Sequence, residues 1–462
     1  MSNPGDADTT PATTTRQLAD YLASGCRERS DWRIGTEHEK FGFSLTDLAA
    51  PPYDGSAGIA ALLDGLHAAK AAEGWTPILD RGHSIGLKGP ASSLGASLSL
   101  EPGGQFELSG GALTNLHQTR QEFQIHFAEL HRVAAPLGLG FAPLGFQPLH
   151  SRAAIPWMPK GRYEIMRAYM PKVGTLGLDM MLRTCTVQVN LDTQSEADMV
   201  RKFRVALAFQ PVATALFANS PFTEGKPNGY LSYRAHIWTD TDPHRTGLPG
   251  IVFEDGFGFE RWTEWLLDVP MYFVHRPGEG YGGYVDVAGA SFRDFMAGRL
   301  PGREGERPTI GDFADHTTTA FPEVRLKRFL EMRGADAGSM AMMLAQSALW
   351  VGLLYDDAAL EAATALMNRH GWQSLVGLRS EVARQAVNTP FAGGTVRDLA
   401  RDLVAIAADG LRARGKGEEG YLDPLRDIVE GGAPTQAEHW LNRYQSVWSG
   451  DVSRIFNEAQ VA

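Results

Sequence analysis

The chain has 462 residues, of which 43% are hydrophobic and 21% charged, and its formal net charge is −11. This acidic balance argues against a nucleic-acid-binding surface, and no run of about 18 apolar residues predicts a membrane-spanning helix. Cys26 and Cys185 are too few for a disulfide framework or a thiolate metal site. Because the polar N-terminus also lacks the apolar core of a signal peptide, we expect a cytoplasmic protein with no membrane partner.

The first third of the chain predicts alternating helices and short strands. Residues 1–14 are polar, and we expect them to form a disordered leader. The pattern then predicts a helix over 15–30, a strand over 34–43, a helix over 56–73, short strands and turns over 82–111, and a helix over 115–135.

The rest of the chain becomes increasingly helical. Residues 159–192 begin as a helix or loop and end as a strand, and Ser195 is a plausible cap for a helix over 195–218. Helices are expected over 339–354, 357–370, 396–414 and 435–449. Because no linker interrupts the chain, we predict one α+β domain over 15–455 whose part from about 339 is rich in helix.

The stretch "GTEHEKFGF" places two carboxylates on one side of the first predicted strand. Side chains alternate between the faces of a strand, so Glu37 and Glu39 share a face with Phe41 and Phe43, whereas His38 takes the other. One interpretation is an edge strand with a solvated face. The other is the wall of a cavity in which the carboxylates bind a hard cation.

Three further predicted strands have one polar face. The first polar face consists of Glu101, Gln105 and Glu107 in "SLEPGGQFELSG". The second consists of Thr184, Thr186, Gln188, Asn190 and Asp192 in "RTCTVQVNLD". The third, in "RFLEMRGAD", joins Glu331 and Arg333. Such faces predict a polar cavity built on a sheet, in which acidic side chains surround one or more Mg²⁺ ions.

Cations near these strands would suit phosphate or carboxylate groups. They are Arg325, Lys327, Arg328 and Arg333 in "FPEVRLKRFLEMRGAD", Lys160, Arg162 and Arg167 in "PKGRYEIMR", and Arg234. No phosphate-binding G-x-x-x-x-G-K-[ST] loop, G-x-G-x-x-G turn or H-E-x-x-H zinc motif occurs. If a nucleotide binds, it binds on another kind of scaffold.

Long motifs of this chain resemble the plant-type glutamate–cysteine ligases, which also occur in proteobacteria. The motifs include "GTEHEKFGF", "EPGGQFELSG", "KGRYEIMRAYMPKVGTLGLDMMLRTCTVQVNLD" and "FPEVRLKRFLEMRGAD". The resemblance covers roughly residues 15 to 455. It implies a glutamine-synthetase-like fold: a curved antiparallel sheet forms a substrate funnel, and helices pack behind it.

The resemblance also implies an activity and its cofactors. The expected reaction joins the γ-carboxylate of glutamate to the amine of cysteine with ATP and Mg²⁺, through a γ-glutamyl phosphate, as the first step of glutathione synthesis. Glutamate, cysteine and ATP are thus the expected partners, and the protein is expected to be a monomer or weak dimer.

The resemblance assigns a role to each candidate residue. The implied metal ligands or their neighbours are Glu37, Glu39, Glu101, Gln105 and Glu107. Arg162 and Arg234 would bind the carboxylates of glutamate, with Thr186 and Gln188 lining the funnel. Tyr163 and Tyr272 would frame the cysteine pocket. Arg325, Lys327 and Arg333 would face the ATP phosphates, and Glu331 would act with Arg333 in catalysis.

Two alternatives remain open at this point. A related ligase would join its carboxylate to an amine other than cysteine. A guanidino-type phosphotransferase of the same wider fold group would move phosphate without forming an amide.

Overall fold

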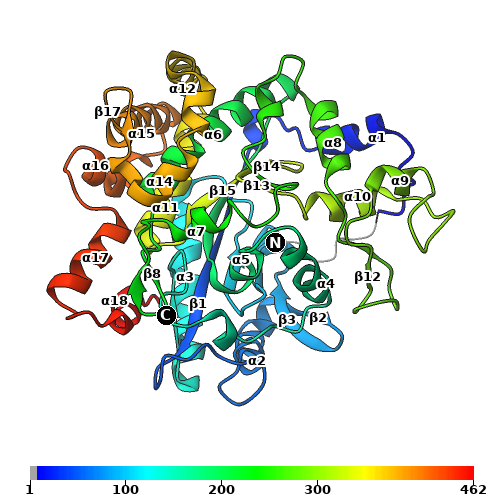
Figure 1. The fold of residues 1–462 in the computed structure, drawn as a ribbon, viewed down its shortest axis with the longest axis horizontal. Helices are drawn as coiled ribbons and strands as arrows, with labels where there is room; N and C mark the ends of the chain where they lie inside the picture. Colours follow the sequence, from blue (N-terminus) through cyan, green and yellow to red (C-terminus); the bar gives the residue numbers. More distant parts are fainter. Residues whose placement is uncertain (1–7) are drawn as a thin grey trace.

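A nine-stranded antiparallel sheet forms the centre of the molecule (Figure 1). The structure is a computed structural model and describes residues 8–462. The strand order is β14-β15-β7-β1-β5-β4-β3-β2, and β6 also pairs with β1. The strands are β1 (Ile34–Ser44), β2 (Thr76–Asp80), β3 (His83–Lys88), β4 (Ser97–Leu100), β5 (Phe106–Ser109), β6 (Leu139–Ala142), β7 (Thr186–Leu191), β14 (Val324–Leu326) and β15 (Leu330–Asp336). The expected antiparallel sheet of an α+β fold is confirmed.

The two faces of the sheet differ in chemistry along strand β1. Its pairing with β5 sets Glu39 opposite Glu107 and His38 opposite Leu108. Its pairing with β7 sets Glu37 opposite Gln188. We call the side that carries Glu37 and Glu39 the front face and the side that carries His38 the back face. Because strand side chains alternate, this register collects the polar residues of three strands on the front.

Helices cover the back face and supply most of the core. They include α3 (Leu116–Ala134), α6 (Glu196–Leu216), α11 (Met340–Leu354) and α15 (Val396–Arg414). Phe123 of α3 packs edge-to-face against His38, and Gln346 of α11 donates a hydrogen bond to the carbonyl of Val187 in β7. Of the helices in the part of the chain that the structure describes, none is both long and apolar enough to cross a bilayer.

The helix-rich end of the chain forms a group beside the sheet, at the left in Figure 1. Helix α11 packs against α15, and α12 (Asp357–His370) and α16 (Asp423–Val429) surround them. Helix α17 (Gln436–Ser446) and α18 (Ile455–Ala459) follow and complete the chain at the lower left.

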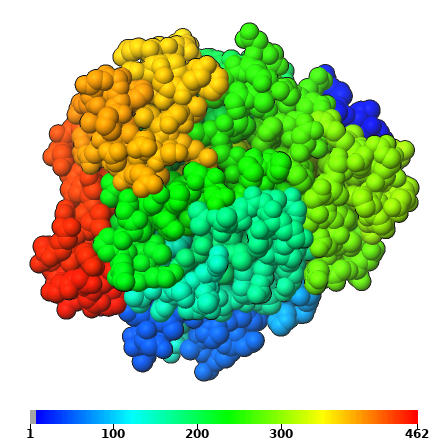
Figure 2. All heavy atoms as spheres, in the orientation of Figure 1, coloured from blue at the N-terminus to red at the C-terminus, as the bar shows by residue number. Residues whose placement is uncertain are grey.

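Shorter elements from the middle of the chain cover the front face. They are α4 (Gly161–Tyr169), α5 (Gly177–Arg183), α7 (Tyr233–Ile237), the hairpin of β11 (Phe273–His275) and β12 (Tyr284–Asp286), and α10 (Ile310–Thr317). In the space-filling view of the same side, the teal and green residues of this middle part lie over the sheet (Figure 2). The front face is therefore enclosed and is not a solvated surface.

Most predicted elements occur near their expected bounds. The side chain of Ser195 accepts a hydrogen bond from the backbone N–H of Asp198, as a helix cap should. The first helix is shorter than expected: α1 (Thr15–Ala23) ends before Gly25, where a Cβ would lie 1.9 Å from the carbonyl oxygen of Arg328. Close packing of two backbone segments ends the helix there, and the local sequence pattern does not contain this information.

The expected disordered leader differs from the structure where the structure describes it. The backbone N–H of Ala12 donates to the carbonyl of Pro308, and that of Ile310 donates to the carbonyl of Thr10. Ala12 is buried. Residues 8–14 therefore pack against the domain, whereas residues 1–7 lie outside the described residues.

Helices α11 and α15 cross at glycines, which gives a stability prediction. A Cβ on Gly352 would lie 2.2 Å from the carbonyl oxygen of Ala407, and one on Gly410 would lie 2.0 Å from that of Gly352. Alanine normally stabilises a helix by about 1 kcal/mol relative to glycine. We expect Gly352→Ala to lower the free energy of unfolding by about 1–3 kcal/mol instead, because the helices must separate.

Urea denaturation measures this effect. Gly65→Ala in α2 (Ile59–Lys70) is the matched control, since its Cβ would lie 2.6 Å from a methyl group of Val133, a side chain that must shift, and not against a backbone carbonyl. A Gly352→Ala variant as stable as the wild type would contradict the close crossing.

Candidate active site

One cavity opens on the front face and contains most of the candidate residues. It lies between β1, β5 and β7 on one side and α4 and α7 on the other. Its lining residues are Glu37, Glu39, Glu101, Pro102, Gln105, Glu107, Lys160, Arg162, Tyr163, Met166, Met180, Met181, Thr184, Thr186, Gln188, Arg234, Trp238, Thr318, Phe321, Arg325 and Arg333. We call it the front cavity.

Carboxylates gather on one wall of the front cavity. Glu39 and Glu107 are directly opposite each other on adjacent strands, and both are buried. Glu101 lies in the turn that leads from β4 to β5. Burial and the charges of Glu101 and Glu107 raise the pKa of Glu39 well above its ordinary value. Burial and the charge of Glu107 also raise the pKa of Glu101. Like charges directly across a strand pair are unfavourable, so this wall requires a cation.

The donor set suits magnesium better than a metal held by protein ligands alone. Within residues 8–462, no three His, Cys, Asp or Glu side chains are grouped closely enough to hold a metal ion by themselves. Magnesium usually keeps several waters and binds through one or two carboxylates together with substrate phosphates. Glu37, Glu39, Glu101 and Glu107 thus fit a site that a phosphate ligand completes.

Three cations surround Glu331 beside the carboxylate wall. Its carboxylate lies 2.7 Å from Arg325, 2.9 Å from Lys327 and 3.5 Å from Arg333. Burial alone would raise its pKa, but these three cations hold it well below the ordinary value. Glu331 is fully buried and does not line the cavity, so it fixes the cations in place and does not itself contact a ligand.

Arg162 and Arg234 enter the front cavity from the covering helices. Arg162 in α4 lies over the ring of Phe273, 5.0 Å from its centroid. Arg234 in α7 donates a hydrogen bond to the carbonyl of Arg333. Both side chains are buried, and together with Arg333 they place positive charge opposite the glutamates.

Strand β7 supplies a polar floor in the way its alternation predicted. Thr186 and Gln188 line the front cavity, and the backbone N–H of Thr186 donates to Glu39. Asn190, two residues farther along, donates to Glu37 and lines an adjoining groove with Lys327. Glu37 lines both spaces, so the groove and the cavity adjoin at this side chain.

The catalytic role expected for Glu331 is corrected to positioning of its three cations, and two further predicted roles do not agree with the structure. The ring of Tyr272 is fully buried outside the cavity, where Arg245 lies 3.8 Å from its centroid, so Tyr272 does not frame a ligand pocket. The amide of Gln105 accepts from the N–H of Gly103 and donates to the carbonyls of Met181 and Thr184. Gln105 therefore braces two segments of the cavity wall, and we no longer assign it a metal.

Sequence reasoning named Lys160 only as a nearby cation and did not select Trp238 at all. Lys160 donates to the carbonyl of Leu100, which also accepts from the hydroxyl of Tyr163. Trp238 lies beneath Arg234 and Arg333, 5.7 and 5.9 Å from their guanidinium carbons. The sequence signal for Trp238 was that an aromatic residue follows a basic segment. This pattern is too common in sequences to identify one residue of a site.

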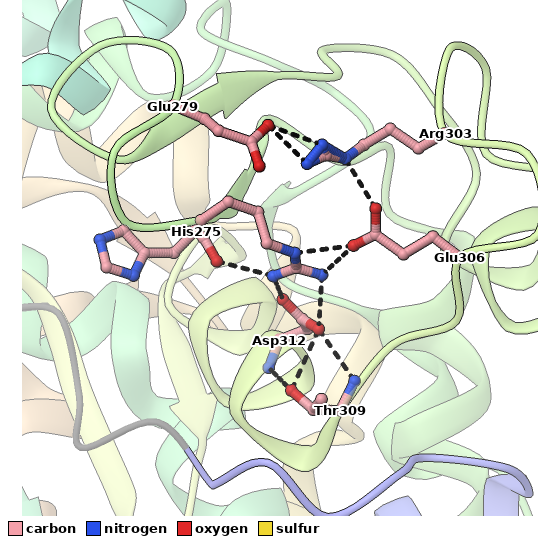
Figure 3. A network of polar contacts seen from close by, with 7 residues as sticks. His275, Glu279, Arg303, Glu306, Thr309 and Asp312 are labelled. Carbon is pink, nitrogen blue, oxygen red and sulfur yellow. Dashed lines mark hydrogen bonds and ion pairs between the residues drawn. The ribbon is translucent and has the colours of Figure 1, made fainter.

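An ion network holds the hairpin of β11 and β12, which packs beneath Arg162. The guanidinium of Arg276 pairs with the carboxylates of Glu306 and Asp312. Figure 3 shows both carboxylates in this network, with Arg303 bridging Glu306 and Glu279. The same hairpin contributes Phe273, on which Arg162 rests. The network therefore helps to position Arg162 without reaching the cavity itself.

Comparison with known proteins identifies the family. The model of glutamate-cysteine ligase family 2 matches residues 33–458. This chain belongs to glutamate-cysteine ligase family 2. The chloroplastic glutamate–cysteine ligase of Medicago truncatula is 51% identical over 96% of this chain and 85% of its own length. The enzyme of Arabidopsis thaliana is 52% identical over 96% of this chain and 82% of its own length.

A solved glutamate–cysteine ligase structure has a similar fold. The glutamate–cysteine ligase of Francisella tularensis, determined in complex with AMP, has a TM-score of 0.54 and 11% identity, and the match covers 93% of this chain and 88% of that one. At this identity the likeness supports the fold alone.

The comparisons correct the expected location. We predicted a cytoplasmic protein, but the matching relatives from Medicago, Brassica juncea and Arabidopsis are all named as chloroplastic enzymes. The names of these relatives contradict the cytoplasmic prediction.

The repulsion at Glu39 gives a pH-dependent stability prediction. Folding raises the pKa of Glu39. The folded state therefore loses stability as the pH rises from the ordinary pKa of the carboxyl toward its raised pKa. In EDTA at pH 8, we expect Glu39→Gln to be more stable than the wild type by about 1 kcal/mol or more, since one pKa unit corresponds to about 1.4 kcal/mol.

Chemical denaturation between pH 4 and pH 8 measures this difference. The gain should shrink as the pH falls toward 4, where the carboxyl is also protonated in the unfolded chain. Added Mg²⁺ should stabilise the wild type more than Glu39→Gln. A variant less stable than the wild type in EDTA at pH 8 would contradict the repulsion.

Proposed function

We propose that this protein joins the γ-carboxylate of L-glutamate to the amine of L-cysteine with ATP and Mg²⁺, giving γ-glutamylcysteine, ADP and phosphate. This is the first step of glutathione biosynthesis. Membership of the family supports the reaction, and one observation supports the site: a wall of buried glutamates meets buried arginines in a single cavity.

The glutamate substrate is assigned to the arginine side. A free carboxylate is a poor acyl donor. The γ-carboxylate of glutamate must therefore first accept the terminal phosphoryl group of ATP. Arg162 and Arg234 can bind carboxylates in a bidentate manner. Trp238 and Phe273 stack beneath them and limit their motion. These contacts hold the reacting oxygen in a fixed position, which lowers the entropic part of the barrier.

The phosphates of ATP are assigned to the cations around Glu331. Arg325 and Arg333 line the front cavity, and Lys327 lines the adjoining groove. Three positive charges share one negative partner, so the cluster retains positive charge for phosphate oxygens. Arg333 would stabilise the charge that develops on the transferred phosphoryl group, and Glu331 would position Arg333.

Magnesium is assigned to Glu37, Glu39, Glu101 and Glu107. These four residues would hold the ion, which would supply positive charge for the phosphate oxygens. Its positive charge would also remove the repulsion between Glu39 and Glu107.

The acceptor amine is assigned to the side of the cavity near Tyr163. Met166, Met180 and Met181 line the cavity beside this ring and offer soft, polarizable contacts to a thiol side chain. The amine attacks the γ-glutamyl phosphate, its proton is lost, and phosphate leaves. Because the wall residues are buried, the enclosed cavity protects the acyl phosphate from water.

Measuring ADP release tests the proposed reaction. Purified protein with Mg²⁺-ATP and glutamate should release ADP only when cysteine is added, and mass spectrometry should identify γ-glutamylcysteine. Release with another amine and not with cysteine would overturn the assigned acceptor. Phosphate transfer without amide formation would overturn the ligase activity.

The two tyrosines provide a paired test of the acceptor pocket. Tyr163 lines the cavity and donates to the carbonyl of Leu100, whereas Tyr272 lies outside it. We expect Tyr163→Phe to raise the KM for cysteine by about 3- to 30-fold, because the hydrogen bond to Leu100 holds the ring in the pocket wall, and losing this bond costs about 1 kcal/mol or somewhat more in ordering the pocket. Tyr272→Phe should leave this KM unchanged. Equal effects of the two substitutions would contradict the placement.

A further inference from the structure

A second cavity lies behind the sheet, on the face away from the front cavity. It encloses about 280 Å³ between α3, β4, β5 and residues 92–96. Its lining residues are Lys70, Trp75, Ser92, Ser93, Leu94, Ala96, Leu98, Leu108, Leu113, Gln118, Gln121, Glu122, Ile125, His126 and Glu129. We call it the back cavity.

The back cavity has an apolar wall that reaches the surface. Leu98 and Leu108 are buried on the back faces of β4 and β5. At the rim, Leu94 is 52% exposed and Ile125 is 50% exposed, which is unusual for side chains of this size. Exposed apolar residues that continue into an apolar cavity are typical of a binding site.

Glu122 is the polar feature of this cavity. One oxygen of its carboxylate accepts from the backbone N–H of Gly111, 2.8 Å away, and the other is buried without a hydrogen-bond partner. Gly110 leaves space for that oxygen, since a Cβ there would lie 2.4 Å from it. Burial raises the pKa of Glu122 to about 7. The carboxylate is therefore held in place but only half satisfied.

The charge around Glu122 is not balanced by the protein. The nearest lysine of the cavity, Lys70, is already paired with Glu129, 2.5 Å away. No lysine or arginine of residues 8–462 forms an ion pair with Glu122. His126 carries no compensating charge, because burial holds its pKa well below the ordinary value. The cavity thus has an acidic excess beside an apolar wall.

We propose that the back cavity binds a small amphipathic amine. The ammonium group would pair with Glu122, and the apolar body would pack on Leu98, Leu108 and Ile125. An anion would be repelled by Glu122, and an uncharged apolar molecule would leave its carboxylate unpartnered. Charge complementarity therefore selects a cation with an apolar body.

This site is separate from the proposed active site and does not depend on the proposed function. Leu108 contacts the back cavity, whereas its neighbour Glu107 lines the front cavity. His126 lies 2.9 Å from the amine of Lys40, whose neighbour Glu39 also faces the front. The ligand would contact the reverse side of the strands that carry the carboxylate wall.

Isothermal titration calorimetry at pH 8 without ATP, glutamate or cysteine tests the proposal. The probe is 2-phenylethylamine, and 2-phenylethanol and 3-phenylpropionate are its uncharged and anionic counterparts. We expect the amine to bind saturably at one site, and each counterpart to bind at least tenfold more weakly. No saturable binding of the amine, or equal binding of the alcohol, would overturn the proposal.

Two variants locate the binding site. Glu122→Gln removes the charge at nearly constant side-chain volume, and it should weaken the binding of the amine at least tenfold. Ile125→Trp fills the mouth from an exposed position and should abolish binding. Asp64→Asn, an equal charge change at an exposed position outside this cavity, should leave binding unchanged. Circular dichroism checks that each variant is folded, and amine binding that survives both Glu122→Gln and Ile125→Trp would overturn the proposal.

Discussion

The pairing of Glu39 with Glu107 across two neighbouring strands is the constraint on which the rest of the site depends. Two buried carboxylates directly opposite each other destabilise a sheet unless positive charge lies nearby. The protein supplies part of that charge through Arg162 and Arg234, which come from helices far along the chain. Covering the front of the sheet with α4 and α7 is thus an electrostatic requirement as well as a packing one.

The back of the sheet explains how such a polar front is tolerated. Strand β1 must stay fixed in register, because a slip by one residue would exchange its two faces. Apolar helices hold it from behind, with Phe123 and Phe127 packed around His38. Lys40 is buried among the same rings, and desolvation lowers its pKa to about 7. A largely uncharged back face anchors the strand whose front carries concentrated charge.

Sequence alternation predicted the strands and their polar faces because a period of two is a local property. It correctly joined Glu37 with Glu39 and Thr186 with Gln188. It could not tell which polar groups the fold itself would use, since hydrogen bonds such as those of Gln105 depend on segments about 80 residues away. The same limit explains the wrong prediction for Tyr272. Its motif suggested a place in the pocket, but the packing of the folded chain buries its ring outside the cavity.

The environment of Glu331 shows why a charged residue near a site need not act on the substrate. With three cations within 3.5 Å, its carboxylate stays ionised although no solvent reaches it. Its charge offsets part of the mutual repulsion of Arg325 and Arg333 and orients them before any ligand arrives. Cations held in advance need little reorganisation when a phosphate binds, which is the condition for strong electrostatic stabilisation in a buried site. The glutamates of the negative wall and Arg325 and Arg333 of the positive cluster line the same cavity, so they present opposite charges to a single ligand space.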